Sequence, residues 1–330
     1  MTVLSLQDKF KNYQRGIVHM PKEKELVFGH KNPDTDAVSA AIAYSYLQNQ
    51  LGYNTEAVAL GEPNLETKFV YDHFNVKYPR IISAINGEVK KVMLVDHNER
   101  QQSVSDIDDV EVTHVVDHHR IANFETSLPL YYRAEPLGCV STIIWKMYLE
   151  EDVEIPGQIA AIMASSIISD TLLLKSPTTT DEDRAALKSL AETAGIDYES
   201  YGLEMLKAGT NLDSKSTQEL IDMDAKSFDM NGTSVRVAQV NTVDVDDTLK
   251  RESDFIKDIK AENADKGYNL FVLLITNILT SDTTGVIIGD AAPIAKFEKA
   301  LNTKVEDNKA ALPGVVSRKK QVVPPLNEQF

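Results

Sequence analysis

Residues Glu25–Ala41 constrain the fold more than any other stretch of this chain. An apolar run ends at His30, an Asn-Pro pair then favours a turn, and an alanine-rich helical pattern begins at Asp36 and reaches about Leu47. This order predicts a strand, a loop and a helix, with His30, Asp34 and Asp36 at the carboxyl end of the strand, where open α/β sheets bind ligands. An Asp there can simply cap the helix, but a cap needs only one Asp. The spacing is therefore compatible with a metal site, and the rest of the chain has to decide.

Two later predicted strands also end in polar side chains. Residues 92–95 form a continuous apolar run, which is typical of a buried parallel strand, and Asp96 follows it. Residues 112–116 form another short strand, which ends in Asp117-His118-His119. A helical pattern over 158–168 ends near Asp170, an isolated carboxylate whose alternative role is to cap a helix end. The candidate ligands that these endings would bring together are His30, Asp34, Asp36, Asp96, His118 and Asp170.

Four carboxylates and two imidazoles in one place predict bound cations. Clustered carboxylates repel one another and hold protons unless positive charge lies among them, and two divalent ions balance four negative charges. Cys139 is the only cysteine and lies in an apolar run, so we expect a small buried side chain and assign it no chemistry. Nitrogen and oxygen ligands suit manganese, cobalt, iron or catalytic zinc. Two such ions about 3.5 to 4 Å apart can share a water and activate it for attack on phosphorus, which predicts hydrolysis of a phosphoric anhydride or ester.

Length and charge restrict the class of protein. A chain of 330 residues is long enough for two domains, and 42% hydrophobic and 25% charged residues are ordinary for a globular protein. A net charge of -16 argues against a general nucleic-acid or anionic-membrane surface. We find no apolar run that would span a bilayer and no apolar core of a signal peptide. With a single cysteine, these features favour a cytoplasmic protein without nucleic-acid or membrane partners.

A change of pattern at 208–216 suggests a boundary between two α/β domains. We expect an N-terminal extension over 1–24, a metal-binding domain over 25–208, a linker over 209–216 and a second domain over 217–330. In the second domain the pattern predicts one amphipathic helix over 244–265. The basic run Ser317–Gln321 lies in a β-like stretch and is expected to be an anion-binding strand. Its Arg318 and Lys319 would meet the charge of a phosphate substrate held between the domains.

Several short motifs follow one another along the chain. They are Gly29-His30-x3-Asp34-x-Asp36, Val95-Asp96-His97-Asn98-Glu99, Val116-Asp117-His118-His119, Ser169-Asp170-Thr171, Asp224-Ala225-Lys226 and Ser317-Arg318-Lys319-Lys320-Gln321. As a set they closely resemble the family II, manganese-dependent inorganic pyrophosphatases, which belong to the DHH phosphoesterase superfamily. The similarity extends over about residues 25–324 and covers both expected domains.

The resemblance implies a role for the motif residues. One metal would be held by His30, Asp34, Asp96 and Asp170, and the other by Asp36, Asp96, His118 and Asp170. The positions that match substrate-binding residues are His119, Lys226, Arg318 and Lys319. Gln102 matches a group near the attacking water, so the expected catalytic residues are His119, Gln102 and Asp96. Asp117 has no ligand role in the family, and we interpret it as orienting a histidine, as metal-bound imidazoles generally require.

The resemblance also implies the fold and the partners. The larger domain would be an α/β domain of DHH type, with a parallel sheet flanked by helices, and the smaller C-terminal domain would be a mixed α/β domain of DHHA2 type. Closure of the domains would bring Arg318 and Lys319 over the metals and exclude water. The implied ligands are two Mn²⁺ ions, with Co²⁺ as an alternative, and inorganic pyrophosphate accompanied by Mg²⁺. A homodimer formed through the larger domain is also implied.

Other functions remain open at this point. An exopolyphosphatase shares the type of second domain. A nanoRNA or cyclic-dinucleotide phosphodiesterase would carry a Gly-Gly-Gly-His type motif in the second domain, and we find none. A metal-binding scaffold without catalysis would be expected to have lost a ligand or a basic group, whereas every motif position holds a competent residue. Hydrolysis of pyrophosphate is therefore the predicted function.

Overall fold

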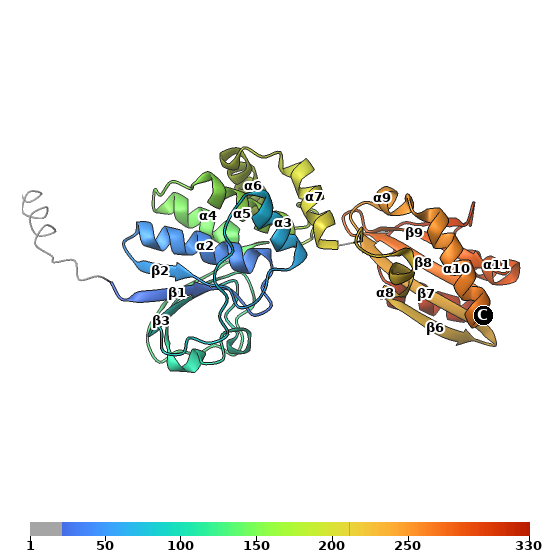
Figure 1. The fold of residues 1–330 in the computed structure, drawn as a ribbon, viewed down its shortest axis with the longest axis horizontal. Coiled ribbons are helices and arrows are strands. Elements are labelled where there is room, and N and C mark those ends of the chain that lie inside the picture. The colour runs from blue at the N-terminus through green and yellow to red at the C-terminus, as the bar shows by residue number, and fades with distance from the viewer. Residues whose placement is uncertain (1–21, 211) are drawn as a thin grey trace, which may run out of the picture.

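The computed structural model describes residues 22–210 and 212–330. Most of the predicted N-terminal extension, residues 1–21, lies outside the described residues, and strand β1 (Lys24–Phe28) begins at the end of that predicted extension. The described chain forms two α/β domains that follow one another along the sequence (Figure 1). None of the described helices is long and apolar enough to cross a membrane.

The first domain is built on a parallel sheet of five strands. Their order is β2 (Asn54–Ala57), β1, β3 (Lys91–Val95), β4 (Glu111–Asp117) and β5 (Tyr131–Ala134). From β1 the chain moves to β2 on one side and then returns to β3 on the other, so the direction of winding changes between β1 and β3. Open parallel sheets bind ligands beside such a switch point, at the carboxyl ends of the strands. The predicted parallel sheet is confirmed, and His30 and Asp96 follow the two strands that flank this point.

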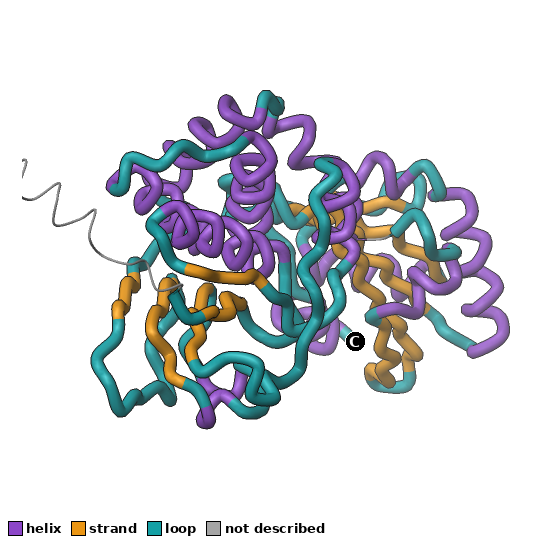
Figure 2. Tube along the Cα trace, turned by 60° about the vertical axis from the view of Figure 1, so that its left-hand side comes forward, coloured by secondary structure: helices purple, strands orange, loops and turns teal. Residues whose placement is uncertain are grey.

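Helices cover one face of this sheet, and loops cover the other (Figures 1 and 2). The helices are α2 (Thr35–Gln50), α3 (Leu65–His73), α4 (Val140–Glu150), α5 (Gly157–Asp170), α6 (Asp181–Ala194) and α7 (Tyr198–Thr210). The loop side contains two short 3₁₀ turns, η1 (Arg100–Gln102) and η2 (Ile107–Asp109). In β3, Met93 packs under the helices, Leu94 packs under the loops, and both are buried. A strand buried on both faces needs consecutive apolar side chains, which explains the continuous apolar run.

The second domain has a mixed sheet of five strands. Their order is β10 (Lys309–Leu312), β9 (Asp282–Gly289), β8 (Leu270–Asn277), β7 (Thr233–Thr242) and β6 (Ala225–Met230), and among these described strands only β7 and β8 pair in parallel. One face is covered by α8 (Thr217–Met223), α9 (Val245–Leu249) and α10 (Glu252–Lys266). The other face is covered by α11 (Ala291–Leu301) and α12 (Val323–Gln329). The predicted mixed α/β domain is confirmed.

Two predictions for the second domain are wrong in detail. The single helix expected over 244–265 is two helices, α9 and α10, and the chain turns between them where Arg251 donates to the carbonyls of Lys215 and Leu212. The basic run is not a strand, because Arg318–Val322 form a helical turn, η3, that leads into α12. Two prolines occupy the first turn of α12. Since proline lacks the N–H that a sheet needs but suits the start of a helix, the β-branched valines beside them do not extend into a strand.

The two domains are joined through α7 and the residues that follow it. Helix α7 continues to Thr210 and thus includes the first two residues of the predicted linker. The Lys207 ammonium lies 2.9 Å from a carboxylate oxygen of Asp244 and 3.3 Å from one of Asp247, at the start of α9. Val243 of the second domain packs in the hydrophobic cluster of the first. Ion pairs at two helix ends and a small apolar contact therefore connect the domains.

Candidate metal centre

Asp34 serves both as a helix cap and as a member of an acidic cluster. Its Oδ1 accepts a hydrogen bond from the Ala37 N–H at 2.9 Å and caps α2. Its Oδ2 lies 3.5 Å from His30 Nε2. The loop is held close to the helix, because a Cβ at Gly29 would lie 2.5 Å from the Ala37 carbonyl oxygen and only glycine fits. The capping interpretation and the ligand interpretation of Asp34 are therefore compatible.

Asp96, which directly follows β3, is a buried carboxylate without a full set of partners. Its backbone has φ +58°, a left-handed conformation that residues other than glycine rarely adopt. Its Oδ1 is buried and has no hydrogen-bond donor among the described residues. Backbone strain and an unpaired buried oxygen are both unfavourable, and such features concentrate at functional sites. The backbone conformation and burial of Asp96 thus suit a carboxylate that binds a cation.

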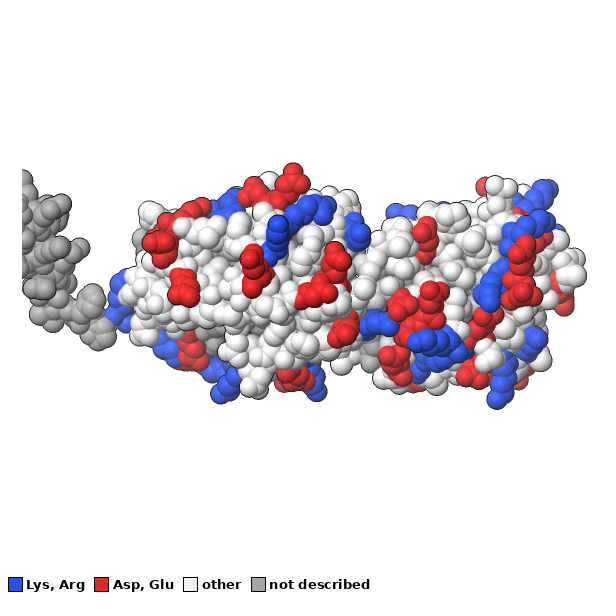
Figure 3. Space-filling view, turned by 90° about the horizontal axis from the view of Figure 1, so that it is seen from above, with Lys and Arg blue, Asp and Glu red and all other residues white. Residues whose placement is uncertain are grey.

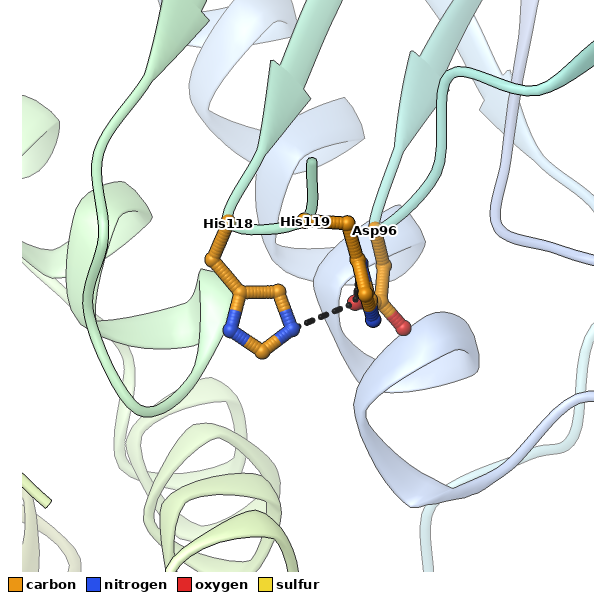
Figure 4. A group of neighbouring side chains, drawn as sticks. All are labelled: Asp96, His118 and His119. Carbon is orange, nitrogen blue, oxygen red and sulfur yellow. Dashed lines mark ion pairs between the residues drawn. The ribbon is translucent and has the colours of Figure 1, made fainter. Parts of the chain in front are cut away.

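One histidine lies close to each carboxylate oxygen of Asp96. Asp96 Oδ2 lies 3.5 Å from His30 Nε2. Asp96 Oδ1 lies 3.2 Å from His118 Nε2 (Figure 4). In each ring Nδ1 lies close to a backbone carbonyl, that of Lys31 at 2.9 Å and that of Leu137 at 3.0 Å. Because a carbonyl only accepts, Nδ1 carries a proton in each ring, and Nε2, which faces the carboxylates, can hold either a second proton or a metal ion. Acceptors that face one another in this way require a proton or a metal ion between them.

The charge of the cluster raises several pKa values. Burial raises the pKa of Asp96, and the charges of Asp36 and Asp34 add to this effect. Burial also raises the pKa of Asp170, with contributions from Asp36 and Asp96. Burial opposes protonation of His30, but its hydrogen bond to Asp34 and the charge of Asp96 outweigh burial and raise the pKa of His30 to about 9. The cluster therefore retains protons until a stronger positive charge replaces them.

Asp36 and Asp170 form a second pair of carboxylates. One oxygen of Asp36 accepts from the Val140 N–H at 2.8 Å and the other from the Ser141 hydroxyl at 2.6 Å, at the N-terminus of α4. Oxygens of Asp36 and Asp170 and the sulfur of Cys139 all lie within 4.8 Å of one another. The Cys139 thiol is buried, as predicted, and burial raises its pKa. Its neutral form therefore adds no charge to the cluster.

Of the six candidate ligands, Asp34, Asp96, His118 and Asp170 line one pocket of about 420 Å³, whereas His30 and Asp36 lie outside its lining. Its lining comes wholly from the first domain and consists of Asp34, Asp96, His118, His119, Arg120, Leu137, Gly138, Asp170 and Thr178. Donor atoms that lie within 4.8 Å of one another link His30, Asp34 and Asp96, and a second such group contains Asp96, His118 and His119. Nitrogen and oxygen donors of this kind suit manganese. The residues present therefore fit the metal centre that the sequence predicts.

His119 stands beside the pocket with a half-exposed side chain. Its Nδ1 lies 3.0 Å from Asp117 Oδ1 and 3.7 Å from Asp96 Oδ1. Asp117 also accepts from the His119 N–H at 3.1 Å and from the Asn98 amide at 2.6 Å. Asp117 thus orients a histidine, but this histidine is His119. The ring of His118 is oriented by a backbone carbonyl instead.

Gln102 lies on η1, near the loop that carries His30. Its backbone carbonyl accepts from the Lys31 N–H at 2.8 Å. Its side chain is exposed, and the residue does not belong to the pocket lining. Gln102 therefore contacts the loop that carries His30 through its backbone and not through its side chain.

The predicted anion-binding residues gather in the second domain. Arg318 is buried, and its guanidinium donates to the Asp224 carbonyl at 2.7 Å, to the Val237 carbonyl at 3.2 Å and to Asp224 Oδ1 at 2.8 Å. Val237 pairs with Lys226 across β6 and β7, so Lys226 and Arg318 lie in the same region. The side chains of Lys226 and Lys319 are exposed. None of these residues lines the pocket of the first domain.

Gln321 holds the basic segment in shape, a role that sequence analysis missed. Its side-chain oxygen accepts from the N–H groups of Val316 at 2.9 Å and Ser317 at 3.0 Å. Its side-chain amide donates to the Gly314 carbonyl at 2.8 Å. Gln321 thus closes a short loop directly before Arg318. The residue was visible in the motif, but nothing in the sequence indicated which backbone groups it would contact.

Asp183 is a second residue that sequence analysis missed. It is fully buried and accepts from the Gly138 N–H at 2.9 Å and from the Thr142 hydroxyl at 2.7 Å. With Thr180 it forms a capping box at the start of α6. The Thr-x-x-Asp spacing was a readable signal for that box. The contact with Gly138, beside the carbonyl that orients His118, depends on the tertiary fold.

Charged side chains of both signs are interspersed over the face shown in Figure 3. No continuous basic surface is visible on that face. This distribution agrees with the negative net charge of the chain. On this face an anionic ligand would therefore meet a few local cations rather than a broad basic field.

Comparisons with known proteins match both domains. The family model described as the DHH family N-terminal domain matches residues 24–167, and that of the DHHA2 domain matches residues 203–329. A probable manganese-dependent inorganic pyrophosphatase of Lactobacillus gasseri is 62% identical over 307 residues, which are 93% of this chain and 99% of that protein. A protein of Enterococcus faecalis with the same description is 60% identical over 307 residues, again 93% of this chain and 99% of that protein.

A solved structure is similar over the same length. It is that of a Methanococcus jannaschii protein solved as a candidate family II inorganic pyrophosphatase, with a TM-score of 0.57 and 39% identity. The match covers 93% of this chain and 99% of that chain. Because relatives of this similarity span almost the whole chain and both domain models match it, the chain belongs to family II, the manganese-dependent inorganic pyrophosphatases.

Proposed function

We propose that the protein hydrolyses inorganic pyrophosphate to two phosphates at the metal centre of the first domain. The observation that carries this proposal is Asp96, a buried carboxylate with an unpaired oxygen that lies within 3.5 Å of the Nε2 atoms of two imidazoles. Nitrogen and oxygen acceptors that face one another suit divalent ions such as manganese. The descriptions of the similar proteins name both manganese and pyrophosphatase activity, which supports the same reading.

In this proposal two ions share the carboxylate cluster. One would be held by His30, Asp34, Asp96 and Asp170, and the other by Asp36, Asp96, His118 and Asp170. The separate directions of the two Asp96 oxygens, toward His30 and toward His118, support a shared role for Asp96. When bound, the two ions would supply an activated water for attack on phosphorus and positive charge for the phosphoryl oxygens. Manganese is the expected metal, cobalt an alternative, and magnesium would enter with the substrate.

The chain's own side chains would bind and orient pyrophosphate. Asp117 fixes the ring of His119 through Nδ1, which leaves Nε2 for the substrate. Gln102, on the turn beside the His30 loop, is proposed to lie near the attacking water and to act with His119 and Asp96 in catalysis.

The second domain, residues 217–330, would supply the cations Lys226, Arg318 and Lys319 to the catalytic unit over 25–208. Because the pocket lining comes wholly from the first domain, these cations reach the substrate only if the linker over 209–216 lets the domains close. Closure would also exclude water from the substrate.

We also propose that the protein forms a homodimer in the cytoplasm through its first domain. Strand β5 lies at the edge of the parallel sheet, and the apolar side chains of Leu128 and Tyr131 are exposed there. An exposed strand edge that carries apolar side chains favours pairing with a second chain. Size-exclusion chromatography with light scattering tests this, and a monomer at all concentrations would contradict it.

The experiment for the main proposal measures phosphate release by metal-stripped protein. Manganese is returned in the presence of excess magnesium, and pyrophosphate, tripolyphosphate and a short RNA are offered separately. We expect rapid, manganese-dependent release from pyrophosphate alone. Preference for tripolyphosphate would indicate an exopolyphosphatase, and preference for RNA would indicate a nuclease. A metal-loaded protein without activity would indicate a scaffold.

A further inference from the structure

Glu66 in the first turn of α3 contacts both segments that carry the carboxylates of the metal centre. The Thr35 hydroxyl donates to Glu66 Oε1 at 2.9 Å. The Ser169 hydroxyl donates to the same oxygen. Neither α3 nor Glu66 belongs to any motif of the site, and the function proposed above gives this residue no role.

The two hydroxyls lie next to proposed metal ligands. Thr35 stands between Asp34 and Asp36 in the chain, and Ser169 directly precedes Asp170. A single carboxylate oxygen therefore ties the start of α2 to the end of α5. These two segments must keep a fixed separation if their carboxylates are to share metal ions, because metal sites tolerate only small errors in ligand position.

The Thr35 side chain is buried among its hydrogen-bond partners and is therefore fixed in position. Its side chain is fully buried, and its hydroxyl also lies 3.1 Å from the Thr67 hydroxyl of α3. Its carbonyl accepts from the Ser166 hydroxyl of α5 at 3.3 Å. Thr35 is thus held by both α3 and α5, and Glu66 is the charged member of this network.

The other side of Glu66 touches the helix that leads to the second domain. A Cβ built at Gly209 would lie 3.2 Å from Glu66 Cβ and 3.2 Å from Glu66 Oε2. Gly209 lies in the last turn of α7, and α3 and α7 are neighbours in Figure 1. Since a Cβ at this distance is tighter than ordinary contact, glycine at 209 allows the Glu66 carboxylate to stay where the two hydroxyls reach it.

We propose that Glu66 is a positioning residue of the metal centre, and that it joins this centre to the end of α7 from which the second domain continues. The proposal rests on the set of metal ligands proposed above. Glu66 acts by holding the Asp34–Asp36 segment at a fixed distance from Asp170, and it is not itself a ligand. Movement of α7 would displace Glu66 and, through it, the spacing of the ligands.

Calorimetric titration of the metal-stripped, full-length protein with Mn²⁺ tests the first part. Removal of an outer partner of a metal site typically weakens metal binding by about 10- to 100-fold, and we expect this for Glu66→Ala. Glu66→Gln keeps an oxygen that can accept from both hydroxyls, so it should bind Mn²⁺ nearly as the unmodified protein does. Asp72→Ala, an exposed carboxylate on the same helix, is the matched control and should change nothing.

A loss of Mn²⁺ affinity could also follow from general damage to the fold. Thermal unfolding of the metal-free variants is therefore measured alongside. If Glu66→Ala does not fold, Ser169→Ala removes one of the two hydrogen bonds and should weaken Mn²⁺ binding in the same direction by a smaller factor. Unchanged Mn²⁺ affinity in both Glu66→Ala and Ser169→Ala would overturn the proposal.

Gly209→Ala tests the connection to α7. Alanine is a better helix former than glycine, so the metal-free variant should unfold at the same temperature as the unmodified protein or at a higher one. The new Cβ would nevertheless push against Glu66, and we expect weaker Mn²⁺ binding, by less than in Glu66→Ala. A more stable protein with lower metal affinity is not explained by damage to the fold. Unchanged affinity would overturn the connection to α7.

The same titration separates this proposal from the function on which it rests. If the unmodified protein binds no manganese, the proposed ligand set fails. If it binds two ions and Glu66→Ala binds them equally well, the ligand set stands and the role of Glu66 fails.

Discussion

Asp96 in the first domain and Arg318 in the second are both buried charged groups, but their partners differ. Asp96 Oδ1 has no donor among the described residues, and Oδ2 faces a histidine nitrogen at 3.5 Å. The Arg318 guanidinium donates to two carbonyls and to the Asp224 carboxylate. Among the described residues, the metal centre therefore keeps a buried carboxylate oxygen without a donor, whereas the cation of the anion-binding region already has its acceptors.

The free energy that a buried charge costs therefore differs between the metal centre and the anion-binding region. A buried charge without a partner costs several kcal/mol, on the order of the penalty for burying an ion, and a bound cation would remove that cost. Metal binding should therefore stabilise the first domain as well as activate it. The Arg318 guanidinium already has acceptors when no substrate is bound. Pyrophosphate must therefore bind the N–H groups of Arg318 that remain free, or displace Asp224.

Asp96→Asn should give the largest loss of activity. The substitution keeps the shape of the side chain but removes the charge of a carboxylate that would bind both ions. We therefore expect kcat for pyrophosphate to fall by about 10³-fold or more. The same change should raise the free energy of unfolding of the metal-free protein by about 1–3 kcal/mol, because an uncompensated buried charge is removed. Urea unfolding in the presence of a chelator measures the second effect. Asp72→Asn is the control, and a less stable metal-free Asp96→Asn would contradict the contrast.

Arg318→Ala should give the next largest effect, about 10²-fold in kcat/KM, because the substrate would lose its charged hydrogen-bond donor, and truncating one partner of a buried charge pair between binding partners costs about 2–5 kcal/mol. The loss should appear mainly as a raised KM, while the affinity for Mn²⁺ stays unchanged. Arg318→Lys keeps the charge but loses the planar fork, so it should recover only part of the activity. Arg236→Ala, which removes another paired arginine of the same domain, is the control. Unchanged kinetics in Arg318→Ala would show that the basic segment does not bind the substrate.

Mn²⁺ affinity should fall as the pH is lowered. His30 has its pKa raised to about 9 and Asp96 and Asp170 have raised pKa values, so each ion must displace protons when it binds. At any pH below about 9 His30 holds a proton that Mn²⁺ removes, and each displaced proton contributes about tenfold in affinity per pH unit. Calorimetry in buffers with different heats of ionisation counts these protons. A dissociation constant that does not change between about pH 6 and pH 8 would contradict the prediction.

Gln321→Ala should give the smallest effect. The substitution removes the side chain that closes the loop before Arg318, at a cost of about 1 kcal/mol per lost hydrogen bond. We expect KM to rise by about five- to tenfold without a change in Mn²⁺ affinity. Steady-state kinetics beside the Mn²⁺ titration measures both quantities. A change confined to Mn²⁺ affinity would show that the two regions are not independent.

The placement of the candidate ligands was largely predictable. His30, Asp96 and His118 each follow a predicted strand, and the carboxyl ends of parallel strands meet at one edge of a sheet. To predict that these residues lie together, it was enough to recognise parallel strands, and the packing of the side chains did not have to be known. The parallel sheet of the first domain is confirmed for the same reason, since burial on both faces leaves a continuous apolar run in β3. The second domain is α/β as predicted, but the mixed directions of its strands are seen only in the structure.

Other features depended on contacts between distant segments. The valines near the basic run suggested a strand, but the prolines and the packing of α12 produced a helical turn. Asp117 was expected to orient a metal-bound histidine, and its partner is His119 because a backbone carbonyl already occupies the ring of His118. The sequence pattern contains no information on which carbonyl approaches a given ring.

The sequence by itself determined which residues could bind metal, because apolar strands and the polar residues at their ends are local patterns with a fixed geometric consequence. Only the tertiary structure decided how those residues are held. Glu66 meets Thr35 and Ser169, and Asp183 meets Gly138, across elements that are distant in the chain. Such contacts arise when helices pack, and packing depends on the shapes of many side chains at once rather than on the spacing of any few.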